Sequence, residues 1–300
     1  MRFGLVVPHY RQISAVDDMV RFARRAEELG YDTLWVTDHV VVPDIAIARF
    51  GENYHEPLTV LAFLAATVER IRLGTSALIA PYRGAVHQAK VLSTLDHLSN
   101  GRMTFAIGAG WSEDETKVLG ADFHRRGRMT REYIEVFRAL WADKNAEFHG
   151  EFVNVEKVTF APPPVQDPLP LWGAGNSAAA MKRAAELCQG WHPTRPTLEF
   201  LGENTERFRE LVMGAGRESE VTVLAARLPL KFDHGDDPEA PTLFGSTQEV
   251  IDKLGRYREL GVTDVVIDTF YSMRELNDEN IETILATAQR FSEEVAPVLA

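Results

Sequence analysis

The sequence predicts an α/β fold, a (β/α)8 or TIM barrel in which parallel strands alternate with helices. Three observations predict it. Short apolar runs that suit strands buried on both faces alternate with amphipathic segments, the connections between them are short, and the alternation continues along all 300 residues. No stretch indicates a second core, so we expect one domain over residues 1–300, with insertions after strand 4 and strand 7.

The first elements follow from apolar spacing and from residues that end helices. The run RFGLVVP stops at Pro8, as a buried strand does. Apolar residues at three- and four-residue steps then predict a helix over 16–29, and Gly30 ends it. The same reasoning predicts strands over 32–37, 71–79 and 103–109 and helices over 57–69 and 85–98.

After Gly110 the alternation becomes less regular, which indicates an insertion. We predict a helical excursion over 111–127, a long helix over 130–143 and a hairpin over 148–160. The prolines between 162 and 170 form a stiff connector rather than a domain linker.

The second half resumes the alternation. Ser246 and Glu249 have the spacing of a capping box that opens a helix, and residues 233–241 are acidic and proline-bearing, as in a loop. The remaining predicted elements are strand 169–172, helix 178–187, a short strand ending near His192, helix 198–213, strand 221–228, strand 261–268 and helix 277–293.

Composition excludes several classes of function. With 44 acidic against 32 basic residues the net charge is −12, and no basic block offsets it, so nucleic acid and anionic membranes are poor partners. The lone Cys188 excludes an internal disulfide, a zinc ribbon and an iron–sulfur cluster. The first residues form too short an apolar run for a signal peptide, and no segment approaches the roughly 18 apolar residues of a membrane span, so we expect a cytoplasmic protein.

Candidate catalytic residues follow the strands, because active sites of this fold lie at the carboxyl ends of the strands. Asp38 and His39 end the second strand, and an imidazole beside a carboxylate suits proton transfer near neutral pH. The alternative is an acid that caps a loop beside a packed histidine. His9, Trp111 and His192 follow other strands; because the histidines come singly from different strands, we expect no metal site.

Small residues at three strand ends leave space for a ligand. The turn Gly173, Ala174, Gly175, Asn176 and Ser177 suits a phosphate at a helix start, although any tight turn uses glycine and the pattern is not GxGxxG. Gly108, Ala109 and Gly110 end the fourth strand, and Ser76 and Ala77 lie in a strand of small residues, where plain barrel packing is the alternative.

Five motifs together resemble the luciferase-like monooxygenase superfamily, and within it the branch of F420-dependent oxidoreductases. They are AEELGYDTLWVTDHV (26–40), ERIRLGTSALIAPYR (69–83), LDHLSNGRMTFAIGAGW (95–111), FHRRGR (123–128) and LPLWGAGNSAAAMKRAAELCQGWHP (169–193). They occur in the family's order over residues 1–193, whereas the last third is similar only in its alternation of predicted strands and helices.

The resemblance implies hydride transfer between C5 of the deazaflavin coenzyme F420 and a small organic substrate. It places His39 near C5 and Asp38 where the ring or the substrate is oriented. It also implies a non-prolyl cis bond at Ser76–Ala77 behind the ring system. The segments Gly108 to Gly110 and Gly173 to Ser177 would hold the ribityl chain and phosphate, and Arg83 or the Arg125–Arg128 cluster would meet the acidic tail of F420.

One departure bears on the substrate. Sugar-phosphate dehydrogenases of this branch carry a glutamate where this chain has Trp111. An apolar or aromatic pocket is therefore the better expectation, with polar contacts from His9, Tyr54, His55 and His192. Two alternatives stay open: an FMN-dependent monooxygenase supplied by a separate flavin reductase, and a non-catalytic barrel subunit. The resemblance also implies a homodimer.

Overall fold

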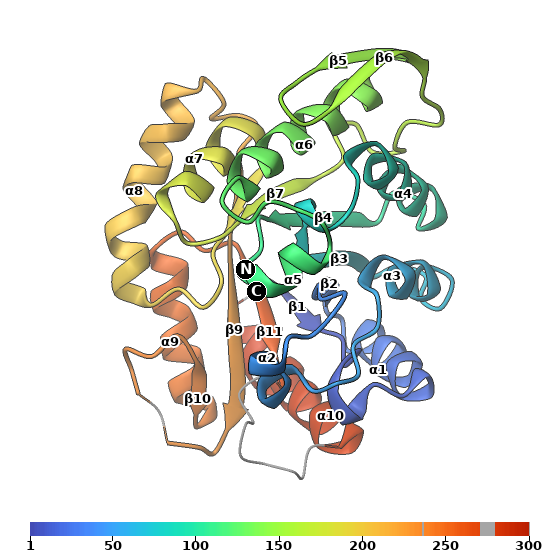
Figure 1. Cartoon of the computed structure of the whole chain (residues 1–300). Helices are drawn as coiled ribbons and strands as arrows, with labels where there is room; N and C mark the ends of the chain where they lie inside the picture. The colour runs from blue at the N-terminus through green and yellow to red at the C-terminus, as the bar shows by residue number, and fades with distance from the viewer. Residues whose placement is uncertain (236, 271–279, 300) are drawn as a thin grey trace.

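Parallel strands close into a barrel in the computed structural model, which describes residues 1–235, 237–270 and 280–299 (Figure 1). The strand order is β9-β11-β1-β2-β3-β4-β7-β8, and β8 pairs back with β9, which confirms the predicted (β/α)8 barrel. The barrel strands are β1 Arg2–Val6, β2 Thr33–Val36, β3 Arg72–Ile79, β4 Met103–Gly108, β7 Leu171–Ala174, β8 Gly190–His192, β9 Val223–Phe232 and β11 Asp264–Asp268.

Helices surround the barrel, as Figure 1 shows. Those that connect its strands are α1 Val16–Glu28, α3 Pro57–Ala65, α4 Ala85–Leu98, α6 Arg126–Ala142, α7 Ala178–Leu187, α8 Leu198–Gly214, α9 Thr247–Glu259 and α10 Ile281–Arg290. The bounds of α4 and α7 are as predicted, and Ser246 with Glu249 forms the predicted capping box of α9. The predicted start of the last helix at Asn277 lies outside the described residues.

The interior of the barrel is filled by Trp35 of β2. Its indole lies over the two neighbouring strands where these carry glycine: a Cβ atom at Gly4 would lie 2.3 Å from Nε1 of Trp35, and one at Gly74 would lie 2.5 Å from Cζ3. The ring of Trp172 lies 5.1 Å from that of Trp35. The small residues predicted within the third strand therefore serve barrel packing at Gly74, and their possible role toward a ligand is confined to the end of the strand.

The predicted insertion after strand 4 is present. It contains α5 Glu113–Val118 and, beyond α6, the antiparallel strands β5 Asn145–His149 and β6 Asn154–Thr159. After the seventh strand of the barrel, which is β9, the chain forms the short strand β10 Leu243–Gly245, and β10 pairs with the end of β9. The insertion predicted there is thus partly a continuation of the sheet.

Smaller elements were not predicted. These are α2 Asp44–Phe50 after β2, the 3-10 turns Arg11–Ile13 and Ala80–Tyr82, the π-helical turn Phe291–Val295 and α11 Ala296–Leu299. The amino group of Met1 donates to the carbonyl of Leu299 at 3.3 Å, so the described ends of the chain meet. Within the described ranges, no helix combines the length and apolar character that crossing a membrane requires.

Candidate active site at the carboxyl end of the barrel

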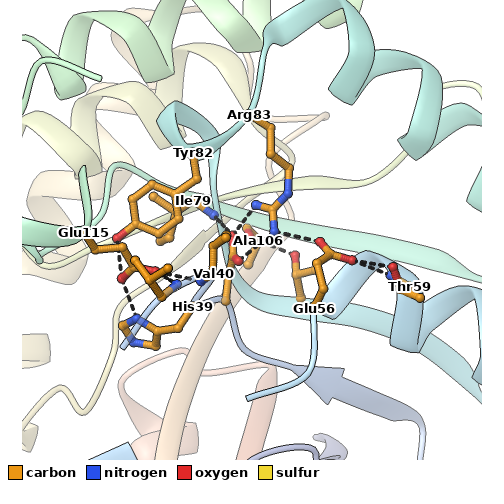
Figure 2. Close-up of polar contacts among 12 residues, drawn as sticks. His39, Val40, Glu56, Thr59, Ile79, Tyr82, Arg83, Ala106 and Glu115 are labelled. Carbon is orange, nitrogen blue, oxygen red and sulfur yellow. Dashed lines mark hydrogen bonds and ion pairs between the residues drawn. The ribbon is translucent and has the colours of Figure 1, made fainter. Parts of the chain in front are cut away.

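Asp38 and His39 follow β2, where the chain has left the strand, and their side chains serve different networks. The buried carboxylate of Asp38 accepts two hydrogen bonds from Arg83, at 2.7 and 2.9 Å, and one from the amide of Ile79 at 2.8 Å. Arg83 also donates to Glu56 at 2.7 Å (Figure 2). Burial raises the pKa of Asp38, and the hydrogen bonds from Arg83 oppose that rise. Asp38 therefore anchors β3 and Arg83 rather than His39.

His39 instead pairs with Glu115 of α5. Nδ1 of His39 lies 2.6 Å from Oε2 of Glu115, and both side chains are buried. The same oxygen accepts from the hydroxyl of Tyr82 at 3.0 Å, while Oε1 accepts from the amides of Val40 and Val41 at 2.7 and 3.2 Å. Figure 2 shows Glu115 between His39 and Tyr82. Sequence reasoning missed Glu115, because the contact joins residues 76 positions apart and the only local signal is an acid in a short helix.

Burial acts to raise the pKa of Glu115, but its hydrogen bonds to His39, Val40 and Tyr82 leave the pKa below its usual value. The carboxylate is therefore ionised at neutral pH and accepts from every neighbour. The site thus contains an imidazole whose inner nitrogen faces a buried negative charge.

The other nitrogen of His39 remains available. Among the described residues, none hydrogen-bonds to Nε2, and the side chain as a whole is 6% exposed. Aromatic rings surround the imidazole, with centroid distances of 4.7 Å to Phe50, 5.2 Å to Tyr54 and 5.7 Å to Trp111. Trp111 is 49% exposed. The second ring nitrogen of His39 therefore lies among aromatic side chains, one of which, Trp111, is exposed.

The Ser76–Ala77 peptide bond is cis, as the family resemblance implied, and the pairing of β3 with β4 shifts register between Ser76 and Leu78. Arg227 of β9, which is ion-paired with Asp268, donates to the carbonyl of Ser76 at 2.9 Å. The hydroxyl of Ser76 lies 2.9 Å from Nε2 of His192. Side chains from several strands thus fix this bulge.

Small residues adjoin the bulge on the next two strands. A Cβ atom built at Gly108 would lie 3.6 Å from that of Ala77 and 3.7 Å from that of Ala174, which are ordinary contact distances. Gly110 has a φ of +85°, which explains the glycine there, and Ala109 lies between them. The bulge predicted to lie behind a flat ring and the glycines predicted to hold the ribityl chain are therefore neighbours in space.

His9 and His192, predicted as substrate contacts, are fully buried. Nε2 of His9 accepts from the amide of Thr37 at 2.9 Å, and Nδ1 faces the carbonyl of His55 at 3.3 Å. Burial lowers the pKa of both His9 and His192 to about 3, so both are neutral at physiological pH. Nδ1 of His192 has no partner within the described structure. Their contact with substrate stays a prediction, whereas Trp111 lies at the exposed rim.

The turn after β7 is held by its own residues. A Cβ at Gly173 would lie 2.5 Å from Cβ of Ala184, so this glycine lets α7 pack on the strand. The side chain of Asn176 pairs with the backbone of Thr194 at 2.8 and 2.9 Å, and Ser177 caps α7. Gly175 has a φ of +124°. Residues 176–179 are exposed, and the first amides of α7 have no intrahelical acceptor, which suits an anion.

Most of the basic residues predicted to meet an acidic tail have acidic partners in this structure, whereas Arg126 donates to the carbonyls of Gly110 and Phe123. Arg83 is held by Asp38 and Glu56, and both Arg125 and Arg128 pair with Glu151. Over the described residues, no group of three His, Cys, Asp or Glu side chains is arranged to hold a metal ion.

Comparison with curated proteins gives relatives of both cofactor classes. An uncharacterized protein of Mycobacterium tuberculosis is 31% identical over 257 residues, which cover 81% of this chain and 84% of that protein. The F420-dependent glucose-6-phosphate dehydrogenase of Amycolatopsis mediterranei is 30% identical over 208 residues, 67% of this chain and 58% of that enzyme. The FMNH2-dependent dimethylsulfone monooxygenase of Pseudomonas putida is 24% identical over 319 residues, 99% of this chain and 84% of that enzyme.

Solved structures share the fold over the whole chain. The monooxygenase RslO1 from Streptomyces bottropensis superposes with a TM-score of 0.84 at 20% identity, covering 100% of both chains. An F420-dependent secondary alcohol dehydrogenase, solved with an F420-acetone adduct, gives 0.81 at 19% identity and covers 100% of this chain and 99% of its own.

The family model described as luciferase-like monooxygenase matches residues 1–237. The chain therefore belongs to the luciferase-like monooxygenase family and is an oxidoreductase or monooxygenase of that family.

Proposed function

We propose that this protein is an F420-dependent oxidoreductase acting on a small, predominantly apolar organic substrate. The observation that carries the proposal is the pairing of Nδ1 of His39 with Glu115, which leaves Nε2 without a hydrogen-bond partner among the described residues. When bound, the deazaflavin supplies or accepts a hydride at C5. A carbonyl that gains a hydride at carbon needs a proton at oxygen, and an alcohol that loses one must release that proton. Nε2 of His39 is placed to donate it in one direction and accept it in the other.

The surface beside His39 supports the binding of a flat ring system. The cis bulge at Ser76–Ala77, Gly108 and Ala174 presents small side chains from β3, β4 and β7. The exposed first turn of α7 supports binding of a phosphate. We propose the same residues, with Ala109, Gly110 and Gly173 to Ser177, as the cofactor site.

Aromatic residues around His39 favour an apolar substrate. The ring centroids of Trp111 and Phe50 lie 6.1 Å apart, and both rings contact the imidazole. A half-exposed indole gives apolar contact, and unlike a glutamate it has no acidic group that could transfer a proton to or from a sugar. Sugar phosphates are therefore the less favoured substrates, although a glucose-6-phosphate dehydrogenase is among the relatives.

An FMN-dependent monooxygenase is the second candidate, and one observation favours it. Arg83, Arg125 and Arg128 are already paired with acids, so the acidic tail of F420 would have to compete for them. FMN has no such tail. In that case a separate flavin reductase would be the partner. The homodimer and the cytoplasmic location stay predictions.

Titration of the protein with F420 and with FMN tests the cofactor. We expect tighter binding of F420, and binding that weakens with added salt because the tail is charged. Tighter binding of FMN would overturn the cofactor assignment. Oxidation of the reduced cofactor in the presence of enones, imines, quinones and alcohols would then identify the substrate class.

Replacement of His39 tests the proton-transfer role. We expect His39→Ala to fold and bind cofactor but to lose about 100-fold in turnover, a typical contribution of general acid–base catalysis. His87→Ala is the matched control, because His87 is exposed on α4. Equal turnover in the two variants would exclude His39 from the reaction.

A further inference from the structure

The environment of Glu115 goes beyond what a structural anchor requires. A carboxylate that only ties two loops together needs backbone donors, and Glu115 has them in the amides of Val40 and Val41. Its second oxygen is directed at the imidazole of His39 and at the hydroxyl of Tyr82. Each carboxylate oxygen of Glu115 thus accepts two hydrogen bonds, and each of the four donors must direct its hydrogen toward the carboxylate.

We propose that Glu115 is a positioning residue that fixes His39 in the tautomer protonated at Nδ1 and thereby makes Nε2 the atom that exchanges the proton with substrate. An ionised carboxylate only accepts hydrogen bonds, so the nitrogen 2.6 Å away must carry a hydrogen. In the neutral imidazole the other nitrogen then has a lone pair. This assignment rests on the function proposed above but concerns the protein's own side chains.

The negative charge of Glu115 acts in both directions of the reaction. When Nε2 has taken a proton, the imidazolium lies against a buried carboxylate that stabilises it. When Nε2 has released the proton, the same carboxylate prevents the ring from adopting the other tautomer, in which Nε2 would carry a hydrogen and could not accept. Tyr82 and the two amides hold the carboxylate itself in place, as Figure 2 shows for the labelled residues.

Glu115→Gln tests the proposal with little change in shape. The amide oxygen of Gln can still accept from Val40 and Val41, while its NH2 group faces Nδ1 of His39 and requires that atom to be an acceptor. The tautomer should therefore invert, and turnover should fall about 10²- to 10⁴-fold, as happens when a catalytic histidine is held in the wrong tautomer.

Nitrogen-15 NMR of histidine-labelled protein without cofactor reads the tautomer directly, and His39→Gln assigns the signal. We expect the neutral ring of the wild-type protein to carry its hydrogen on Nδ1 and that of Glu115→Gln to carry it on Nε2. A wild-type ring protonated at Nε2 overturns the proposal even if the variant fails to fold. An unchanged tautomer in a folded Glu115→Gln protein overturns it as well.

Two further variants separate positioning from stability. Glu132→Gln is the matched control, because Glu132 also accepts from backbone amides, those of Glu151, Phe152 and Val153, and no histidine among the described residues hydrogen-bonds to it. We expect it to change stability without moving the His39 signal or turnover. Tyr82→Phe removes one donor from Glu115 and should leave the tautomer unchanged. If the tautomer inverts in Glu115→Gln but turnover does not fall, the positioning role is overturned.

The two proposals fail in distinguishable ways. If wild-type protein turns over with FMN and not with F420, the proposed cofactor is wrong, yet the NMR result still decides the placement of the proton. If F420 supports turnover and the wild-type tautomer is the Nε2 form, only the role of Glu115 is wrong.

Discussion

His192 shows how burial at a single residue converts a titratable side chain into a neutral one. Its ring lies parallel to Trp35, with 10° between the planes, and its pKa is lowered to about 3 from 6.5 by loss of solvent. One ring nitrogen meets Ser76 and the other has no partner in the described structure. Protonation of the folded protein would place an unpaired charge inside the barrel.

That environment predicts an acid-dependent loss of stability. The unfolded chain binds a proton near pH 6.5 and the folded chain only near pH 3, so the free energy of unfolding falls as pH falls through this window. The slope for one such histidine is about 1.4 kcal/mol per pH unit. We expect His192→Gln to show a shallower decline below pH 6.5 than the wild-type protein, measured by urea unfolding at several pH values. His87→Gln should keep the wild-type slope, and equal slopes in all three would contradict the assignment.

Local sequence could indicate His39 but not its partner. A histidine directly after a buried strand lies at the barrel rim whatever the details, because strand ends meet there. Glu115 was missed because its role depends on how α5 folds back over the loop after β2, which no local pattern specifies. The role of Asp38 in orienting the ring or the substrate stays a prediction, and its contact with Arg83, which follows β3, could not be read from local sequence.

At the scale of elements, α7 and β7 depend on Gly173 for close packing. A Cβ at this position would lie 2.5 Å from Cβ and 2.7 Å from Cα of Ala184, and backbone atoms move less readily than flexible side chains. We expect Gly173→Ala to lower the free energy of unfolding by about 1–3 kcal/mol through overpacking. Denaturant unfolding measures the change.

The matched control for Gly173 lies on α8. Gly202 is exposed, and nothing lies within 4 Å of a Cβ built there. Because alanine is a better helix former, Gly202→Ala should raise the free energy of unfolding by about 0.5–1 kcal/mol. The same substitution should therefore lower the free energy of unfolding at Gly173 and raise it at Gly202. A destabilised Gly202→Ala protein, or a neutral Gly173→Ala protein, would refute this packing argument.

Elements with a strong period were predictable, and those defined by tertiary contact were not. The helices α4 and α7 match their predicted bounds because apolar spacing and flanking breakers agree. β9 continues to Phe232, beyond the predicted end at Leu228, because β10 pairs with its last residues. The segment of α2, DIAIARF, has four consecutive apolar residues and is too short to show a helical period, and Phe50 is buried there against Tyr10 and His39.

At the scale of the whole molecule, the order of the strands and the packing of side chains inside the barrel depend on each other. The β2 strand lies between β1 and β3, and each neighbour carries a glycine where the indole of Trp35 crosses it. A large side chain on one strand thus fills space that two adjacent strands leave open. In the same arrangement Trp172 and His192 pack against the indole, and His192 in turn contacts the hydroxyl of Ser76 in the bulge of β3.

Removal of Trp35 should therefore destabilise the entire barrel. Trp35 is 2% exposed, and no other side chain can take its place beside Gly4 and Gly74, so we expect Trp35→Ala to lower the free energy of unfolding by about 3–5 kcal/mol. Trp111→Ala is the comparison, because that indole is 49% exposed at the rim and its loss should cost no more than about 0.5 kcal/mol. Urea unfolding followed by far-UV circular dichroism measures both. Equal losses of unfolding free energy in the two variants would mean that Trp35 does not form the centre of the core. A much larger loss in Trp35→Ala, together with loss of substrate turnover in Trp111→Ala, would show that Trp35 stabilises the barrel and that Trp111 faces the substrate.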